Sequence, residues 1–260
     1  MAKPQPKAPR QHPFAVIRRA REELGIDRVM VGISGGKDSL ATLDLCCEHF
    51  PPGCVHGYFL YLVPGLSFQE RYLAYLERRF RLSITRLPHW MLSFWFQENH
   101  FRHQTAVRHT TRLTRIRDVE AHLRAITGVE WFATGEKCCD SLERNTQIVQ
   151  CGGINPQRRR IFPLGFWSHA AVYNYIKQKN IALPPEYATA DGGSASSFGS
   201  FWERDIKMIR EHYPDDFAKI KKMFPLIESQ GVRYSLRDEM KKVAEAASAA
   251  EHNGEHGIDH

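Results

Sequence analysis

The sequence predicts an α/β fold, with a doubly wound, mostly parallel five-stranded sheet, helices on both of its faces and a helical C-terminal segment. Three observations predict this class. Short β-branched runs alternate with segments of helical periodicity, and a glycine-containing turn joins the first of these runs to a helix. The chain, with 260 residues of which 42% are hydrophobic, is also long enough to bury a sizeable core.

The expected elements alternate along the chain. A helix covers residues 14–24 and ends at Gly25. The run RVMVGI at 28–33 is the first strand, because it is short, apolar and β-branched, as a buried parallel strand is. Further strands are expected at 55–63, 83–88, 130–135 and 158–164, and further helices at 40–50, 68–80, 168–179, 201–213 and 215–224. Such alternation gives right-handed crossovers that cover both faces of a sheet.

The domain boundaries are expected from composition. Residues 1–12 are a mobile basic tail, 13–199 form the α/β domain, 200–243 the C-terminal helices and 244–260 a flexible tail. Within the domain, residues 89–128 form a helical insertion that is aromatic in its first part and basic in its second. It is either a lid or a platform that binds nucleic acid through rings and cations, or a pair of amphipathic helices packed on the sheet.

The net charge and the number of cysteines limit the classes of protein to which the chain can belong. Thirty-six Lys and Arg against 29 Asp and Glu give a net charge of +7, with basic clusters at 102–117 and 158–160. These segments indicate either a nucleic-acid partner or a solvated basic face. Six cysteines without export signals favour reduced thiols. No run reaches the roughly 18 to 20 apolar residues of a membrane span, so a cytoplasmic protein without membrane contact is expected.

One loop carries a chemical signal. The hexapeptide SGGKDS, Ser34 to Ser39, follows the first predicted strand and opens a helix. Backbone N–H groups at such a turn and helix N-terminus bind anions, and glycines allow close approach of the main chain to phosphate oxygens. Lys37 adds a positive charge and the serines add hydroxyl donors. The loop is not a Walker A motif, because Asp38 follows Lys37 where Ser or Thr is required.

SGGKDS resembles the SGGxDS signature of the PP-loop ATP pyrophosphatase superfamily, whose members are adenine nucleotide alpha hydrolases. VPGLSFQERY at 63–72 resembles the DTGxxFPETY segment of its phosphoadenosine phosphosulfate reductase branch. GEKCCDSLER at 135–144 resembles that branch's GxRxxES motif, with Lys for Arg and Asp for Glu. Residues 161–187 resemble its PLxxWxxxDVWxYI segment, so the resemblance covers 28 to about 199.

This resemblance implies a binding site for ATP and Mg2+. The phosphates would lie at the 34–39 loop, the adenine along the second strand, and the 135–144 loop over the phosphates. Lys37 and Asp38 would carry the catalytic roles, with Asp38 as the Mg2+ ligand, a hard-oxygen role that suits a carboxylate. The nucleotide-binding residues it implies are Ser34, Gly35, Gly36, Ser39, Tyr61, Leu62, Gly65, Gly135, Lys137, Ser141 and Arg144.

The sequence also departs from the family pattern. No cysteine follows Cys151, whereas the reductases use a C-terminal cysteine to attack sulfur. Val63 stands where the DTG segment has Asp. Cys138, Cys139 and Cys151 resemble cysteine sets that hold iron–sulfur clusters in some relatives, and the alternative is three small thiols with a packing role.

Three functions follow from these observations. The leading hypothesis is an ATP pyrophosphatase that adenylates an acceptor, with nucleic acid as a candidate, for insertion of sulfur or nitrogen. The second is a sulfonucleotide reductase-like protein whose thiol comes from elsewhere. The third is a non-catalytic nucleotide-binding or assembly protein. A sulfur-donor protein and a second copy of the chain are further candidate partners.

Overall fold

The computed structural model of the chain describes residues 12, 14–89, 116–184 and 209–229. Residues 1–11 of the predicted basic tail, residues 90–115 of the predicted 89–128 insertion and the predicted tail at 244–260 therefore lie outside the described residues. The chain divides into two compact units. The first comprises Met1–Phe59, Tyr75–Thr85 and Arg124–Pro184, and the second Leu60–Ala74, Arg86–Leu123 and Pro185–His260.

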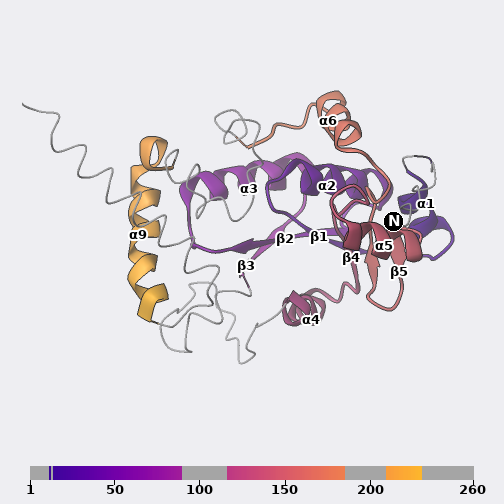
Figure 1. Cartoon of the computed structure of the whole chain (residues 1–260), viewed down its shortest axis with the longest axis horizontal. Helices are drawn as coiled ribbons and strands as arrows, with labels where there is room; N and C mark the ends of the chain where they lie inside the picture. Colours follow the sequence, from indigo (N-terminus) through magenta and orange to yellow (C-terminus); the bar gives the residue numbers. More distant parts are fainter. Residues whose placement is uncertain (1–11, 13, 90–115, 185–208, 230–260) are drawn as a thin grey trace, which may run out of the picture. The chain divides into compact units, whose positions relative to one another are not determined.

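The sheet has six strands in the order β3-β2-β1-β4-β6-β5 (Figure 1). The strands are β1 Val29–Gly32, β2 Val55–Tyr61, β3 Ile84–Pro88, β4 Trp131–Ala133, β5 Ile154–Asn155 and β6 Arg160–Ile161. β1 pairs in parallel with β2 and β4, and β4 in parallel with β6. The predicted α/β class is thus confirmed. The prediction missed β5, a two-residue edge strand antiparallel to β6, which is too short to carry a periodic signal.

Most of the helices fall close to their predicted positions, but the helix at Leu142–Gln150 was not predicted. They are α1 Ala15–Glu22, α2 Lys37–His49, α3 Ser67–Phe80, α4 Ile116–Thr127, α5 Leu142–Gln150, α6 His169–Gln178 and α9 Pro214–Ser229. Residues 209–212 are helical as well, so the described end of the predicted 201–213 helix is found. No helix among the described residues combines the length and the apolar character of a membrane span.

In the first unit, β1 forms the centre of the core. Val29, Met30 and Val31 are fully buried, as the continuous apolar run predicts for a strand covered on both faces. α2 follows β1 directly, and its Leu40 and Leu43 are also fully buried. This packing fixes the turn between β1 and α2 at the carboxyl end of the central strand.

A polar contact holds α6 against α2. The Tyr175 hydroxyl donates to Asp44 Oδ2 at 2.6 Å and to Glu48 Oε2 at 3.2 Å, and Lys179 pairs with Glu48. Burial raises the pKa of Asp44, with the hydrogen bond from Tyr175 acting in the opposite direction. Burial and the hydrogen bond to Asp44 likewise raise the pKa of Tyr175. These contacts hold the C-terminal half of α6 against α2.

In the second unit, a carboxylate from α9 caps α3. The buried Asp216 Oδ2 accepts from the Ser67 N–H and hydroxyl, both at 2.7 Å. Lys219 pairs with Asp216 Oδ1 at 2.9 Å and donates to the Gly65 carbonyl at 2.6 Å. Burial acts to raise the pKa of Asp216, but the hydrogen bonds from Ser67 and Lys219 outweigh it, so the pKa is lowered. These contacts satisfy the otherwise unpaired N–H groups of the first turn of α3.

Candidate functional site

The turn between β1 and α2 is built for close approach of an anion. Gly35 adopts φ +78°, a left-handed conformation that strongly favours glycine. Gly36 is the N-cap of α2 and offers no side-chain cap. Because the first N–H groups of a helix have no acceptor within the helix, the start of α2 presents donors at the positive end of the helix dipole.

Two serines fix the shape of this turn. The Ser34 N–H and hydroxyl both donate to Ser39 Oγ, at 3.2 and 3.1 Å. The Ser39 hydroxyl donates to the Gly36 carbonyl at 2.8 Å, and the Gly36 N–H donates to Ser34 Oγ at 3.3 Å. The turn is therefore closed by its own side chains before any ligand arrives.

A row of alternating charges extends from the turn to the loop after β4. Lys37 Nζ lies 3.1 Å from Asp38 Oδ2, and Lys137 Nζ lies 2.9 Å from Asp38 Oδ1. Lys137 Nζ also lies 3.0 Å from Asp140 Oδ1. The Lys137 side chain is 0% exposed, whereas that of Lys37 is 11% exposed. Lys137 is thus a buried cation between two carboxylates.

Asp140 organises the loop that faces the turn. Its Oδ2 accepts from the Lys137 N–H at 2.9 Å, and Arg144 Nη1 lies 3.7 Å from the same oxygen. Burial acts to raise the pKa of Asp140, but hydrogen bonds from Lys137 and the charges of Lys137 and Arg144 outweigh it and lower the pKa. Asp140 is therefore held in its ionised form.

Gly135 brings this loop against the start of α2. A Cβ at Gly135 would lie 2.8 Å from both the carbonyl carbon and the carbonyl oxygen of Asp38, closer than real Cβ contacts. The neighbouring atoms belong to the backbone and cannot turn away. Glycine at this position is what permits Lys137 to reach Asp38.

The structure brings most of the predicted residues of the first unit together. Ser34 to Ser39, Gly135, Lys137 and Arg144 are linked by the contacts above. Ser141 is the N-cap of α5, where its Oγ accepts from the Arg144 N–H at 3.2 Å. Arg144 therefore lies in the first turn of a helix, and the expected 135–144 loop ends at Ser141.

Three predicted nucleotide contacts lie in the second unit. Tyr61 ends β2 and Leu62 follows it, and both are buried. Gly65 adopts φ +67° and its carbonyl accepts from Lys219. The structure describes the two units each on its own, so the adenine position stays a prediction.

The predicted cluster ligands Cys138, Cys139 and Cys151 stay a prediction, and Cys139 also lies near two other potential metal ligands. The pKa of Cys138 is raised, mainly by burial and then by Cys139 and Cys151 among its neighbours. Among the described residues, however, the potential ligand atoms that converge within 4.8 Å belong to Cys139, Asp140 and His169. Sequence reasoning missed His169, because a single histidine at the start of a helix carries no local signal.

Sequence reasoning also missed a polar groove beside α5 and β5. Its volume is about 980 Å3, and Arg19, Gln147, Gln150, Cys151, Asn155 and Arg158 are among the residues that line it. Arg158 belongs to the predicted basic segment 158–160. Amide and guanidinium groups offer both donors and acceptors for a polar ligand.

Comparison with known proteins gives one family. The model of the phosphoadenosine phosphosulfate reductase domain matches residues 28–229. No curated protein sequence matches the chain.

Three solved structures are similar in fold. A U34-tRNA thiolase from Methanococcus maripaludis with its [4Fe-4S] cluster has 13% sequence identity and a TM-score of 0.46, and the match covers 86% of this chain and 80% of that chain. A phosphoadenylyl-sulfate reductase from Candida auris in a phosphate complex has 13% identity and a TM-score of 0.44, with 71% of this chain and 89% of that chain covered. An NH3-dependent NAD synthetase from Campylobacter jejuni with nitrate has 14% identity and a TM-score of 0.46, with 86% of this chain and 94% of that chain covered. At these identities and TM-scores the likeness carries no information about the reaction.

Proposed function

Since the chain belongs to the phosphoadenosine phosphosulfate reductase domain family, we propose that its 34–39 loop binds the phosphates of ATP and that the protein adenylates an acceptor. The observation that carries this proposal is the serine-closed turn at the start of α2, which has glycine at both of its critical positions. Backbone donors at a helix N-terminus suit a phosphate and leave no side chain in its way.

Lys37 is the residue best suited to reach the nucleotide. Its ammonium contacts Asp38 and lies 5.3 Å from the centre of the Tyr173 ring, and its side chain keeps some exposure. A phosphate at the turn would attract the Lys37 ammonium away from Asp38 Oδ2. Lys137, which contacts two carboxylates and has no exposure, would instead keep the two loops together.

The charge balance of the site favours a magnesium-bound nucleotide. The ion-paired side chains comprise equal numbers of basic and acidic groups: Lys37, Lys137, Arg144, Asp38, Asp140 and Glu136. The site is therefore close to neutral, and a triphosphate would bring several uncompensated negative charges. When bound, Mg2+ would neutralise phosphate charge as the acceptor oxygen attacks.

Asp38 fits the role of magnesium ligand. Its Oδ2 accepts from Lys37 at 3.1 Å, its Oδ1 forms an ion pair with Lys137 at 2.9 Å, and each carboxylate oxygen has a further lone pair. If Lys37 turns to a phosphate, Oδ2 becomes available to a hard cation. The same carboxylate would then hold Lys137 on one side and the metal on the other.

In the proposed reaction an oxygen of the acceptor attacks the α-phosphorus of ATP. The bond between the acceptor oxygen and the α-phosphorus forms as the bond to the bridging oxygen breaks, and pyrophosphate leaves with that electron pair. Lys37 and the N–H groups at the start of α2 would stabilise negative charge on the phosphate oxygens in this step. Adenylation makes the acceptor carbon reactive toward a sulfur or nitrogen nucleophile.

Nucleic acid is the acceptor class that we propose. The groove lined by Arg19, Asn155 and Arg158 combines two guanidinium groups with amide side chains, a set that can bind phosphate and the edge of a base. The net charge of +7 favours a polyanionic partner in the same way.

Calorimetry tests the nucleotide proposal. ATP, phosphoadenylyl sulfate and GTP, each with Mg2+, are titrated into the wild type, Lys37→Ala and a charge-matched control, Lys177→Ala, which changes an exposed lysine of α6. We expect ATP to bind best, Lys37→Ala to weaken it by at least about tenfold, and Lys177→Ala to leave it unchanged.

Two outcomes would redirect the proposal. Preferential binding of phosphoadenylyl sulfate would favour the reductase-like function, with a thiol supplied by a partner. Tight ATP binding without pyrophosphate release, in the presence of RNA or DNA and a sulfide donor, would favour a non-catalytic protein. Absence of binding by any of the three nucleotides would remove the proposal altogether.

A further inference from the structure

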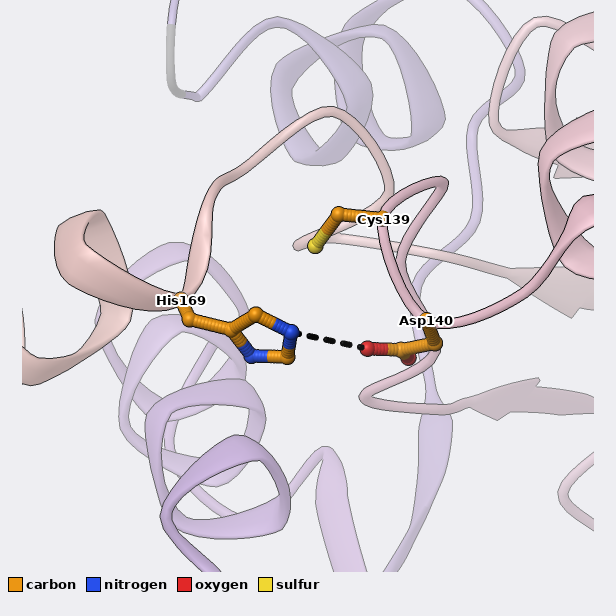
Figure 2. Close-up of side chains that lie close together, drawn as sticks. All are labelled: Cys139, Asp140 and His169. Carbon is orange, nitrogen blue, oxygen red and sulfur yellow. Dashed lines mark ion pairs between the residues drawn. The ribbon is translucent and has the colours of Figure 1, made fainter.

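Two turns in the first unit bring a thiol, a carboxylate and an imidazole together. Cys139 and Asp140 lie in the turn before α5, and His169 is the first residue of α6 (Figure 2). The potential ligand atoms of the three side chains all lie within 4.8 Å of one another. His169 Nε2 is 3.9 Å from Asp140 Oδ1.

The backbone holds these two turns in place. The Cys138 N–H donates to the Gly165 carbonyl at 2.8 Å, and the Cys139 thiol donates to the Trp167 carbonyl with a sulfur-to-oxygen distance of 3.5 Å. Ser168 caps α6 through the Ala171 N–H at 3.1 Å. The two turns that carry the three side chains are therefore held beside each other.

We propose that Cys139, Asp140 and His169 bind one zinc ion, with the fourth coordination position open to solvent. The donors are one sulfur, one nitrogen and one oxygen, a set that suits a borderline-soft ion such as Zn2+ and does not suit Mg2+. Three protein ligands with an open fourth position are typical of zinc sites that bind a further ligand. Cys139 is exposed and the His169 side chain is 55% exposed, so the ion can enter from solvent.

The distances between the three potential ligand atoms are close to those of a zinc site, so binding requires only small movements of the side chains. Zinc–ligand bonds of about 2.0 to 2.3 Å place the ligand atoms of a tetrahedral site roughly 3.3 to 3.8 Å apart. The three atoms already lie within 4.8 Å of one another, and rotations of the exposed Cys139 and His169 side chains can close the difference. Asp140 need not move.

Asp140 can bind the zinc ion and remain paired with Lys137. Its Oδ1 lies 3.0 Å from Lys137 Nζ, and a carboxylate oxygen has two lone pairs, so one remains for the zinc ion. Cys139 would bind as the thiolate, so the proton that it donates to the Trp167 carbonyl is released to solvent and that hydrogen bond is lost. The thiolate offsets one charge of the ion, and the Asp140 carboxylate is shared between the ion and Lys137.

The proposed zinc site is separate from the proposed magnesium site at Asp38. Asp38 contributes oxygen alone, and Lys137 stands between the two carboxylates. The zinc proposal rests on the geometry of the two turns and does not depend on nucleotide binding. Its open position would accept water, sulfide or a thiolate.

Metal titration of the full chain tests the proposal. Zn2+ is titrated by calorimetry, and Co2+ by absorbance, because a thiolate-to-cobalt charge-transfer band reports a cysteine ligand and intense visible bands report tetrahedral geometry. We expect one equivalent to bind, and Cys139→Ser and His169→Ala each to weaken binding by more than about tenfold. The matched controls are Cys54→Ser and His212→Ala, which change a thiol and an exposed imidazole elsewhere.

The C-terminal segment also contains histidines, so the titrations are repeated with His252, His256 and His260 changed to alanine. If the variants still bind one equivalent of metal ion, the result supports the site. If they no longer bind the ion, the proposal is overturned. Loss of the cobalt band in Cys138→Ser and Cys151→Ser but not in His169→Ala would also overturn it, because three cysteines would then be the ligands. His169 is exposed, so that variant stays informative if Cys139→Ser folds poorly.

Discussion

Replacing Lys137 by methionine tests whether the buried cation holds the two loops together. Methionine approximates the length of the aliphatic stem but leaves Asp38 and Asp140 without the ammonium between them. The ion-pair distances of 2.9 and 3.0 Å correspond to about 5 to 6 kcal/mol of gross attraction each at an effective dielectric constant of about 20. Desolvation of the ammonium offsets much of this attraction.

Removing one partner of a buried ion pair typically costs about 3 to 5 kcal/mol, because the remaining charge is left uncompensated. We expect Lys137→Met to lower the free energy of unfolding by that amount at neutral pH. Urea unfolding followed by far-ultraviolet circular dichroism measures it. Lys177→Met, a change of an exposed lysine on α6, should have an effect below about 0.5 kcal/mol.

The pH dependence gives a second, independent test. In the wild type the pKa of Asp140 is lowered from 3.8, largely through Lys137, so its contribution to stability is present above pH 3.8 and is lost as the pH falls through the folded value. Without Lys137, burial should raise this pKa, and the ionised carboxylate then opposes folding at neutral pH. The stability difference between the two proteins should therefore shrink as the pH falls toward 4.

A double substitution separates this account from a packing defect. Lys137→Met with Asp140→Asn should recover about 1 to 3 kcal/mol of the loss, because one of the two carboxylates that lost the Lys137 ammonium is then neutral. A loss below about 1 kcal/mol for Lys137→Met, or a loss that does not depend on pH, would refute the assigned role of Lys137.

Two further changes test the loop contact and the helix cap. Gly135→Ala should cost about 1 to 3 kcal/mol and weaken ATP binding in calorimetry, because its Cβ would lie 2.8 Å from the Asp38 carbonyl; unchanged stability and affinity would mean that the loop can shift. Asp216→Ala should cost about 1 to 2 kcal/mol in urea unfolding, because Ser67 loses the acceptor for its N–H. Asp216→Asn, which keeps one acceptor oxygen, should cost less, and equal losses for the two variants would contradict the cap.

The sequence was most informative where structure is local. The apolar run of β1 and the glycines of the following turn act within a few residues, so strand, turn and helix could all be predicted. The N-cap at Ser141 had a local signal as well, because serine before a helical segment is a common cap, and this signal would have placed Arg144 in α5.

The contacts that define the site depend on residues far apart in the chain, and these could not be predicted. Lys137 pairs with Asp38, and Cys139 reaches Trp167, only because β4 lies beside β1 and α6 is tied to α2. Sequence spacing alone gives no measure of such distances. His169 enters the site through the same packing, which explains why no motif indicated it.

The two lysines of the site, Lys37 and Lys137, differ in burial, and this difference assigns them different roles that the sequence alone does not distinguish. By resemblance, both Lys37 and Lys137 would meet phosphate. A phosphate could draw Lys37 away from one carboxylate oxygen at little cost, since its side chain keeps some contact with solvent. Moving Lys137, which is fully buried, would remove the ammonium between Asp38 and Asp140 and leave each carboxylate with only its more exposed basic neighbour, Lys37 or Arg144. Lys37 can therefore leave Asp38 for a phosphate during a catalytic cycle, whereas Lys137 stays between its two carboxylates. We expect substitution of Lys37 to affect chiefly nucleotide affinity and substitution of Lys137 to affect chiefly folding.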